Sequence, residues 1–373
     1  MPSSNPSFAT RVVAWQRRHG RSDLPWQGTR DAYRIWVSEI MLQQTQVSTV
    51  IPYYERFVAR FPDAATLAAA SEDEVMRFWS GLGYYARARN LHRAARAIVA
   101  AHGGCFPLLI SDVLDLPGVG RSTAAAVVAF ATGEPHAILD GNVKRVFARH
   151  FGVAGPVDSA AIAAKLWALA ESLVPTKGVE GYTQGLMDLG ATVCTRTSPA
   201  CANCPVRGSC VALRDGRIAE LPGRKPSRPV PARRVAMLVV VSRGEVLVEK
   251  RPPSGIWGGL WSLPEVPADA DPAAWAAKTL GLRVDRLDAL EPFTHAFTHF
   301  TLGVTPWLVR LKGAAPAAGE AFTMWLPLQE AAAAALPAPV KKMLARLPRE
   351  APSREGSARA GSGAGSPGGR RGR

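Results

Sequence analysis

The sequence predicts a multidomain protein, in which an all-α domain over residues 1–213 precedes a smaller α+β domain over residues 235–350. Apolar residues recur at helical spacing from Asp31 to about Leu213, and the alternation typical of strands begins only after that. Between the two, residues 214–234 hold four prolines and seven Lys or Arg against two acids, which predicts an extended basic linker. A chain of 373 residues is long enough to bury two separate cores.

The helices expected in the first domain follow this apolar periodicity, and short Gly/Pro turns join them. Almost no segment alternates in the way of a strand, so the domain should be helical throughout. The expected helices cover residues 35–57, 74–78, 86–101, 122–131, 143–151, 160–173 and 182–193.

The second domain should combine strands with helices. The strands are expected at residues 235–241, 245–250 and 300–311, and the helices at 273–280 and 328–346. Arg243-Gly244 forms the turn between the first two strands. The final residues, 351–373, are almost entirely Gly, Ser, Ala, Pro and Arg, which predicts a disordered basic tail.

The chain carries a net charge of +15 and has a pI of about 10.2. An excess of this size attracts polyanions, of which nucleic acid is the first candidate, although a solvated basic surface would give the same charge. No apolar run reaches the roughly 18 residues that a membrane span needs. Residues 1–10 lack an apolar signal segment, so we expect the protein to stay in the reducing cytoplasm. We also expect a monomer.

Four cysteines, spaced C-x6-C-x2-C-x5-C, lie close together near the end of the first domain. They are Cys194, Cys201, Cys204 and Cys210, and Cys105 is the fifth and last cysteine of the chain. So few cysteines do not make a disulfide framework, and thiolates at this density are typical metal ligands. Zinc is one reading, but four-cysteine zinc sites usually use two C-x-x-C pairs far apart. A [4Fe–4S] cluster suits the asymmetric spacing better.

A glycine-rich string, Leu116 to Thr123, precedes a run of apolar residues that should be helical. Gly118 and Gly120 flank Val119, and the absence of Cβ atoms permits close backbone approach. Their N–H groups, with the N-terminus of the next helix, can hold a phosphate oxygen. An ordinary turn between two helices is the other reading.

Two carboxylates complete the candidate site. Asp140 directly precedes a helix, where an aspartate is usually an N-cap, and backbone N–H donors would hold it ionised. Glu39 should share one helix face with Gln43, with Gln46 just beyond. A glutamate at the start of a helix is usually solvated. The run of amides in an otherwise apolar helix, beside Trp36, argues against that reading.

Taken in order, these strings resemble the adenine DNA glycosylases over about residues 25–212. The strings are SEIMLQQTQV, the segment from Gly81 to Asn90, LPGVGRST, LDGNVKR and the cysteine loop. The hairpin and cluster loop are shared with endonuclease III, whereas Glu39 and Ser122 are specific to the adenine branch. The resemblance implies a helix-hairpin-helix glycosylase with an iron–sulfur loop. It would hydrolyse the N-glycosidic bond of adenine opposite 8-oxoguanine or guanine in double-stranded DNA.

The resemblance also implies roles for individual residues. Glu39 would protonate adenine N7 and later handle the water, while Asp140 would stabilise the cation at C1′. The adenine must leave the duplex, and Gln44, Leu82 and Tyr84 match residues that fill the vacated stack, although turn packing also explains the last two. The DNA-binding set implied for this domain is Trp26, Gln43, Gln44, Thr45, Leu82, Tyr84, Gly118, Gly120, Ser122, Asn142, Lys144 and Gln184.

Ser122 separates two reaction types. Endonuclease III-type enzymes have a lysine at this place, whose amine forms the Schiff base for strand cleavage. Serine cannot form that bond, so the chain should be a monofunctional glycosylase or have only weak lyase activity. The alternatives are a pyrimidine-lesion glycosylase/lyase of the endonuclease III type and a non-enzymatic iron–sulfur DNA-binding protein.

In the second domain, the string WGGLWSLPE resembles the opening of a Nudix fold. A working Nudix hydrolase needs a glutamate cluster for Mg²⁺, and residues 266–282 contain no glutamate, so this domain should bind without hydrolysing. The resemblance implies lesion recognition by a Phe-Ser-His turn. Phe297, Thr298 and His299 are the preferred match, and residues 293–295 are a competing register.

Overall fold

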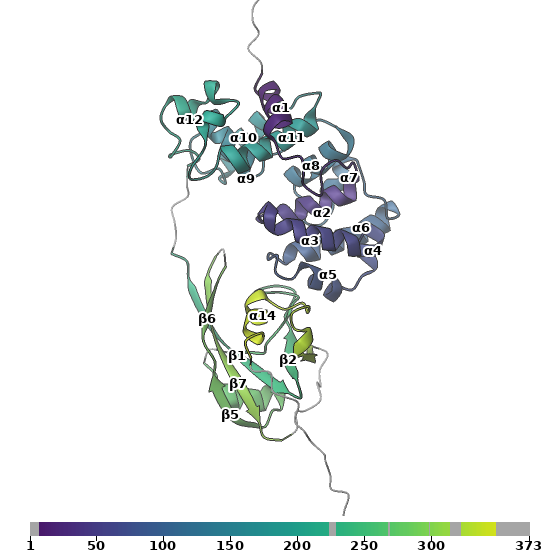
Figure 1. Cartoon of the computed structure of the whole chain (residues 1–373), viewed down its shortest axis with the longest axis vertical. Coiled ribbons are helices and arrows are strands. Elements are labelled where there is room, and N and C mark those ends of the chain that lie inside the picture. The colour runs from purple at the N-terminus through teal and green to yellow at the C-terminus, as the bar shows by residue number, and fades with distance from the viewer. Residues whose placement is uncertain (1–6, 224–228, 268, 298, 314–321, 348–373) are drawn as a thin grey trace, which may run out of the picture.

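The structure is a computed structural model of the chain that describes residues 7–223, 229–267, 269–297, 299–313 and 322–347. A helical domain and a domain built on a β-sheet lie one beyond the other along the long axis of the molecule (Figure 1). This is the multidomain fold that the sequence predicts. The expected tail, 351–373, lies outside the described residues.

The first domain is helical throughout its described residues, as predicted. Its α-helices are α1 Phe8–His19, α2 Ala32–Leu42, α3 Val47–Arg60, α4 Ala64–Ala69, α5 Glu72–Trp79, α6 Ala86–His102, α7 Ile110–Leu114, α8 Arg121–Thr132, α9 Gly141–His150, α10 Ala160–Leu173, α11 Val179–Asp188 and α12 Val211–Arg214. A π-helix, η1 Leu189–Val193, extends α11, and two 3-10 turns, η2 Cys201–Asn203 and η3 Arg207–Ser209, lie in the cysteine loop.

Helix α8 divides this domain into two lobes, because its two faces belong to different apolar cores. Ala124, Val127 and Val128 pack with α2 to α7, whereas Ala125 and Ala126 pack with α1 and α9 to α11. A helix that is apolar on all sides must be covered on all sides. The boundary between the lobes is where a deep pocket can form.

The prediction of one helix over residues 35–57 was wrong. Helix α2 ends at Leu42, Gln43 is its C-cap, and α3 begins after Gln46, so Gln46 does not continue the helix face of Glu39. The interruption falls at Gln44, whose φ of 58° lies in the left-handed region. Helix α1 was not predicted, although Ser7 caps it and Val12 is fully buried.

The second domain has a mixed sheet of eight strands within its described residues. They are β1 Ala232–Ser242, β2 Glu245–Lys250, β3 Trp261–Ser262, β4 Glu265–Val266, β5 Val284–Ala289, β6 Phe293–Ala296, β7 Thr301–Leu311 and β8 Thr323–Pro327. The main path runs β3-β2-β1-β7-β5, with β4 paired to β1, β6 to β7 and β8 to β2. Strands β1 and β7 are parallel.

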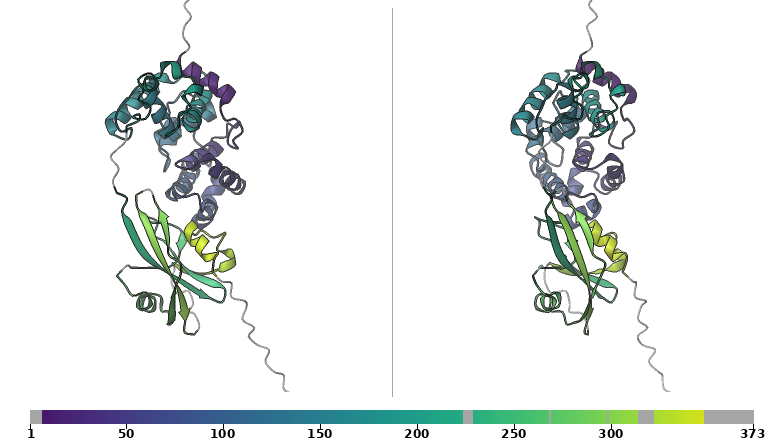
Figure 2. Two further views of the ribbon diagram at one scale, coloured as in Figure 1. Left: turned by 60° about the vertical axis from the view of Figure 1, so that its left-hand side comes forward. Right: turned by 90° about the vertical axis from the view of Figure 1, so that its left-hand side faces the viewer.

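The two faces of this sheet are covered by different elements. Along β1, Leu238 and Val240 face the core that includes α13 Pro272–Leu280, whereas Met237 and Val239 face the opposite core. The opposite core also holds residues of α14 Ala338–Leu344 and continues into the helical domain. Both views in Figure 2 show α14 on the side of the sheet nearer to that domain.

Several boundaries differ from the predictions. Residues 328–346 form only a 3-10 turn, η4 Leu328–Glu330, and α14, because Pro337 and Pro339 disfavour a continuous helix. Strand β1 starts at Ala232, inside the predicted linker, and Leu221 is buried against the helical domain. Strands β5, β6 and β8 were missed because they are short or alternate weakly.

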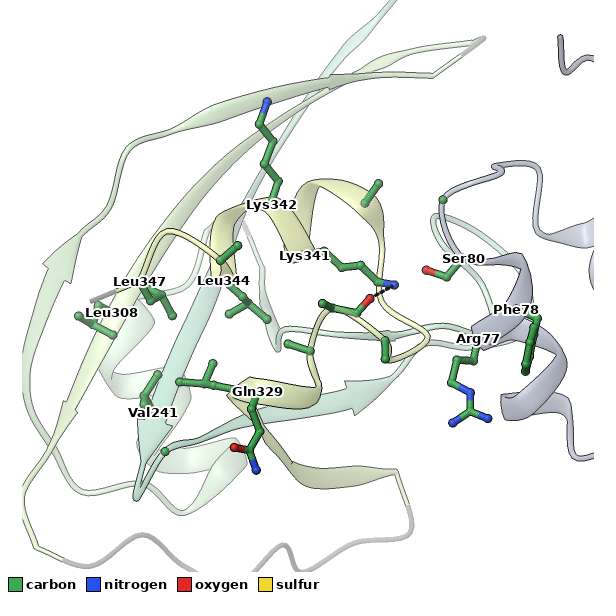
Figure 3. Close-up of a pocket in the computed structure, with 18 of the residues that line it drawn as sticks. Arg77, Phe78, Ser80, Val241, Leu308, Gln329, Lys341, Lys342, Leu344 and Leu347 are labelled. Atoms are coloured by element: carbon green, nitrogen blue, oxygen red, sulfur yellow. Dashed lines mark hydrogen bonds between the residues drawn. The ribbon is translucent and has the colours of Figure 1, made fainter. Parts of the chain in front are cut away.

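The two domains touch along a seam of direct contacts. The Ser80 hydroxyl donates to the Leu336 carbonyl at 2.8 Å, and the Arg89 guanidinium donates to the carbonyl of Gly258, in the Nudix-like string. Beside the seam lies a cavity of about 1240 Å³, with Arg77 and Phe78 on one side and Lys341 and others of α14 on the other (Figure 3). None of the helices in the described ranges is long and apolar enough to cross a bilayer.

Candidate active site

Glu39 opens onto a pocket of about 440 Å³ at the boundary between the two helical lobes. Helix α2 carries it, and the pocket is also lined by the apolar side chains of Trp26 and Phe130 and by Gln184 of α11. Leu42, which follows Glu39 by three residues on the same helix, does not line this pocket. The main lining residues are Gln16, Trp26, Thr29, Arg30, Ile35, Ser38, Glu39, Phe130, Glu180, Gly181 and Gln184.

The surroundings of Glu39 favour its neutral form. Burial raises the pKa of Glu39 to about 8, and the negative charge of Asp140 adds to the rise. Within the described residues, its carboxyl makes no hydrogen bond or ion pair that would favour the charged form. At neutral pH, Glu39 therefore carries a proton that it can donate into the pocket.

Asp140 is the N-cap of α9, as predicted. Its carboxylate accepts from the Val143 N–H at 2.8 Å and from the Asn142 amide at 3.2 Å. Burial raises the pKa of Asp140, and these hydrogen bonds oppose the rise. The two carboxyl groups are therefore unequal: only Asp140 has donors that stabilise its anion, while Glu39 has none.

The glycine-rich hairpin, Leu116 to Thr123, contacts the segment that leads into Asp140. The Ser122 hydroxyl accepts the Leu139 N–H at 2.9 Å, which holds the segment just before Asp140. Gly118 has a φ of +79°, and a Cβ there would lie 2.6 Å from the Cβ of Asn90. Gly120 is the N-cap of α8 and offers no side chain to its first N–H groups. Those donors are available to an anion.

The residues expected to enter the DNA stack lie in two turns. Gln44 and Tyr84 are exposed, and both have positive φ, 58° and 50°. Leu82 differs, because only 5% of it is exposed and it packs in the first apolar core. In this conformation Leu82 shows the ordinary turn packing that the sequence left open. Gln43 donates to the Thr123 hydroxyl at 3.3 Å, so the first turn contacts the hairpin helix.

Other members of the predicted set have identifiable partners. The Gln184 amide donates to Asp188 at 2.8 Å, which orients the side chain beside the pocket. Lys144 pairs with Asp158 at 3.2 Å, on the surface next to Asp140. Asn142 accepts from Arg145 at 2.8 Å through its side-chain oxygen.

The four cysteines of the loop line one small cavity. They come from the end of η1, from η2 and from the turns on either side of η3. Buried Arg149 donates to the Cys194 sulfur at 3.4 Å and to the Thr195 carbonyl at 2.7 Å. In the described part of the chain, no three potential ligands gather as around a single metal ion. The loop brings four thiols to one place and supplies a cation beside them.

The β6–β7 hairpin extends from the end of the sheet toward the helical domain (Figures 1 and 2). Phe297 and His299 lie at its tip, where Phe297 stacks on Phe300 with ring centroids 4.6 Å apart. Thr298 lies outside the described residues. Residues 293–295 of the competing register lie within β6, with His295 and Phe297 packed against Trp257.

Two arginines near the site, half-buried Arg21 and buried Arg87, were not predicted to have a role. Arg21 forms an ion pair of 2.6 Å with fully buried Asp188, beside Gln184. Arg87 is only 8% exposed and holds both turns that carry Gln44 and Tyr84. The sequence signal for Arg87 was its position among the apolar residues of helix 86–101, because an arginine is rarely buried without a specific role.

Comparison with known proteins agrees with this geometry. Residues 37–172 match the HhH-GPD superfamily of base excision DNA repair proteins, and residues 235–346 match the NUDIX domain. The structure resembles that of a thermostable thymine-DNA glycosylase, with a TM-score of 0.51 and 32% identity, over 56% of this chain and 95% of that one. The fold and the site together define a helix-hairpin-helix DNA N-glycosylase of base excision repair.

Full-length relatives identify the branch. The adenine DNA glycosylase of Buchnera aphidicola subsp. Acyrthosiphon pisum is 34% identical over 90% of this chain and 96% of that protein. The human adenine DNA glycosylase is 32% identical over 90% of this chain and 73% of its own length. The chain belongs to the adenine DNA glycosylase family, and it is an enzyme that removes adenine from DNA.

Proposed function

We propose that the enzyme removes adenine opposite 8-oxoguanine or guanine in double-stranded DNA, by hydrolysis with Glu39 as acid and Asp140 as stabilising carboxylate. The observation that carries this proposal is the unequal pair of carboxyl groups: Glu39 lines the pocket, and Asp140 lies near enough for its charge to raise the pKa of Glu39. Glu39 has a pKa raised to about 8 and no partner within the described residues, whereas Asp140 is held by two donors. Acid-assisted glycosidic cleavage needs one group of each kind.

The steps follow from these two environments. An extruded adenine would enter the pocket beside Trp26, where the Glu39 carboxyl donates its proton to N7. The protonated base is a better leaving group, so the C1′–N9 bond breaks and positive charge develops on the sugar. Asp140 opposes that charge as an anion. The Glu39 carboxylate then accepts a proton from the water that attacks C1′.

We propose that the remaining predicted residues hold the DNA. The hairpin glycines and the α8 N-terminus would bind phosphate, Gln44 and Tyr84 would fill the vacated stack, and the hairpin tip at Phe297 to His299 would contact the opposite base. The net charge of +15 supports backbone binding. We also propose that the chain is a monomer in the reducing cytoplasm; the lack of a disulfide among its five cysteines supports the reducing compartment.

We propose that Cys194, Cys201, Cys204 and Cys210 hold a [4Fe–4S] cluster. The four thiols line one small cavity, and their asymmetric spacing suits a cluster better than the two distant C-x-x-C pairs usual for zinc. When bound, the cluster would cross-link the loop covalently, while Arg149 balances the thiolate charge.

The direct test compares short duplexes that differ only in the base opposite one adenine. Excision opposite 8-oxoguanine and guanine, with adenine opposite thymine left intact, supports the proposal. Equal excision opposite thymine would remove the mispair assignment. Release of oxidised pyrimidines instead of adenine would indicate the endonuclease III-type alternative.

The rate of excision should fall as pH rises through about 8. The raised pKa of Glu39 means that its proton is present below about 8 and lost above it. Single-turnover excision should therefore drop about tenfold per pH unit on the alkaline side. Binding to abasic product DNA, which needs no proton, is the control at each pH. A rate that stays flat to pH 9.5 would show that Glu39 is not the acid.

Replacing Ser122 by lysine should introduce Schiff-base chemistry. Borohydride should trap little protein–DNA adduct with the unaltered chain and much more with Ser122→Lys, because the new amine stands at the hairpin position beside Leu139. Arg121→Lys is the matched control, since it places an amine one residue away, on the exposed side toward Glu171. Efficient trapping by the unaltered protein would contradict a monofunctional reaction.

Thr298 should affect lesion preference and not chemistry. A lost hydroxyl contact costs about 0.5–1.5 kcal/mol, so Thr298→Ala should reduce the preference for 8-oxoguanine over guanine by roughly tenfold at most. Excision opposite guanine should be unchanged. Thr294→Ala, at an exposed position of β6, tests the competing register. If only Thr294→Ala alters the preference, the recognition turn is residues 293–295.

A further inference from the structure

Arg87, near the start of α6, connects three backbone segments with one guanidinium group. Its Nη1 lies 2.9 Å from the Ile40 carbonyl, 2.7 Å from that of Met41 and 2.6 Å from that of Gln43. The first two of these are among the last carbonyls of α2, the helix that carries Glu39. Arginine near a helix C-terminus satisfies carbonyls that have no partner within the helix.

The other nitrogen, Nη2, reaches the two turns expected to enter the DNA. It donates to the Thr45 hydroxyl at 3.0 Å, next to Gln44, and to the Gly83 carbonyl at 3.1 Å, next to Tyr84. The guanidinium also lies over the Tyr84 ring, 5.4 Å from its centroid. The Arg87 side chain therefore contacts both of the turns that are expected to fill the vacated stack.

These two turns are strained where Arg87 holds them. Among the described residues, four residues other than glycine have positive φ, and Gln44 and Tyr84 are the two in the helical domain. Bulky residues keep such a conformation only where the surroundings impose it. Arg87 makes the contacts beside both.

We propose that Arg87 is a positioning residue for base extrusion: it holds Gln44 and Tyr84 in the conformations that enter the duplex and sets both against the helix that carries Glu39. This rests on the proposed excision of an extruded adenine. It also explains why a cation is buried there, although no carboxylate in the described residues pairs with it.

The chemistry of the side chain is suited to this role. Burial lowers the pKa of Arg87 to about 10, which leaves the group charged at neutral pH. A guanidinium presents five donors in a rigid plane, so it can bond two turns and a helix end together. A lysine ammonium is a point donor and cannot span the same set of acceptors.

The experiment uses Arg87→Lys in the full-length protein with its cluster, and Arg93→Lys as the matched control. Arg93 lies on the same helix, is exposed and bonds only Asn90 among described residues. Single-turnover excision is measured with adenine opposite guanine and with adenine opposite an abasic-site analogue. The second adenine has no pairing partner, so its extrusion costs less.

We expect Arg87→Lys to slow excision opposite guanine by about tenfold to a hundredfold, the range of one lost stacking contact, and to leave excision opposite the abasic analogue within about threefold. Arg93→Lys should change neither. The alkaline limb near pH 8 should stay in place, because Glu39 is unaltered. An equal loss on both duplexes, or no loss on either, would overturn the proposal.

A second pair of variants decides the matter if Arg87→Lys does not fold. Thr45→Val removes one acceptor of the guanidinium, and Thr45→Ser keeps it. Slower excision opposite guanine in the valine variant alone, with excision opposite the abasic analogue unchanged, supports the role of Arg87; equal rates for the two variants, or an equal loss on both duplexes, overturn it. If the unaltered protein excises adenine from neither duplex, the proposed function fails, independently of Arg87.

Discussion

Glu39→Gln should abolish adenine excision from every mispair while leaving tight binding intact. The amide keeps the size and polarity of the side chain but cannot supply the proton. A general acid or base contributes about 10²–10⁴-fold to a rate. Glu39 acts in both proton transfers, to adenine N7 and from the attacking water, so we expect the excision rate to fall by at least about 10³-fold. Single-turnover assays against the same duplexes measure the loss, and a gel-shift or fluorescence assay measures binding.

The variant also has a signature in stability. The pKa of Glu39 is higher in the folded protein than its ordinary value of 4.5. Between about pH 4.5 and 8 the carboxyl ionises in the unfolded chain but stays protonated in the folded protein, so the fold loses stability as pH rises over this range. Glu39→Gln should therefore melt at a higher temperature than the unaltered protein at pH 8, and at a similar temperature at pH 4.

Glu55→Gln, at an exposed position of α3, makes the same chemical change away from the pocket. It should alter neither excision nor melting. Retained turnover in Glu39→Gln would favour the non-enzymatic or the alternative glycosylase reading over the one proposed.

Cys204→Ala should remove the cluster and, with it, the folded loop. The loop from Cys194 to Cys210 contains only two short 3-10 turns and has few buried apolar side chains, so little else holds it together. The unaltered protein should be brown and absorb broadly in the visible range. The variant should be colourless, mostly insoluble and unable to bind DNA.

Cys105→Ala is the matched control, because Cys105 is exposed and lies outside the loop. It should retain colour, iron content and excision. Metal analysis provides the decisive measurement: stoichiometric zinc without iron in the unaltered protein would overturn the cluster assignment, whatever the colour of the variants.

The sequence by itself determined the features that depend on local spacing. The cysteine pattern, the Gly118 and Gly120 string, and the capping position of Asp140 each lie within a few consecutive residues. Their local geometry follows from chain stereochemistry, which neighbouring residues largely set. The two-domain division was equally readable, because helical and strand periods differ.

Only the tertiary structure decided what happens between segments far apart in the chain. The pocket at Glu39 needs α11, more than 140 residues later, and the raised pKa comes from burial that no local pattern shows. The apolar periodicity runs on through Gln44, so the sequence pattern did not show the break there. The turn is held by Arg87, a buried arginine on another helix, which no local pattern shows. Burial and long-range hydrogen bonds depend on which surfaces meet, and a sequence pattern records only which surfaces are apolar.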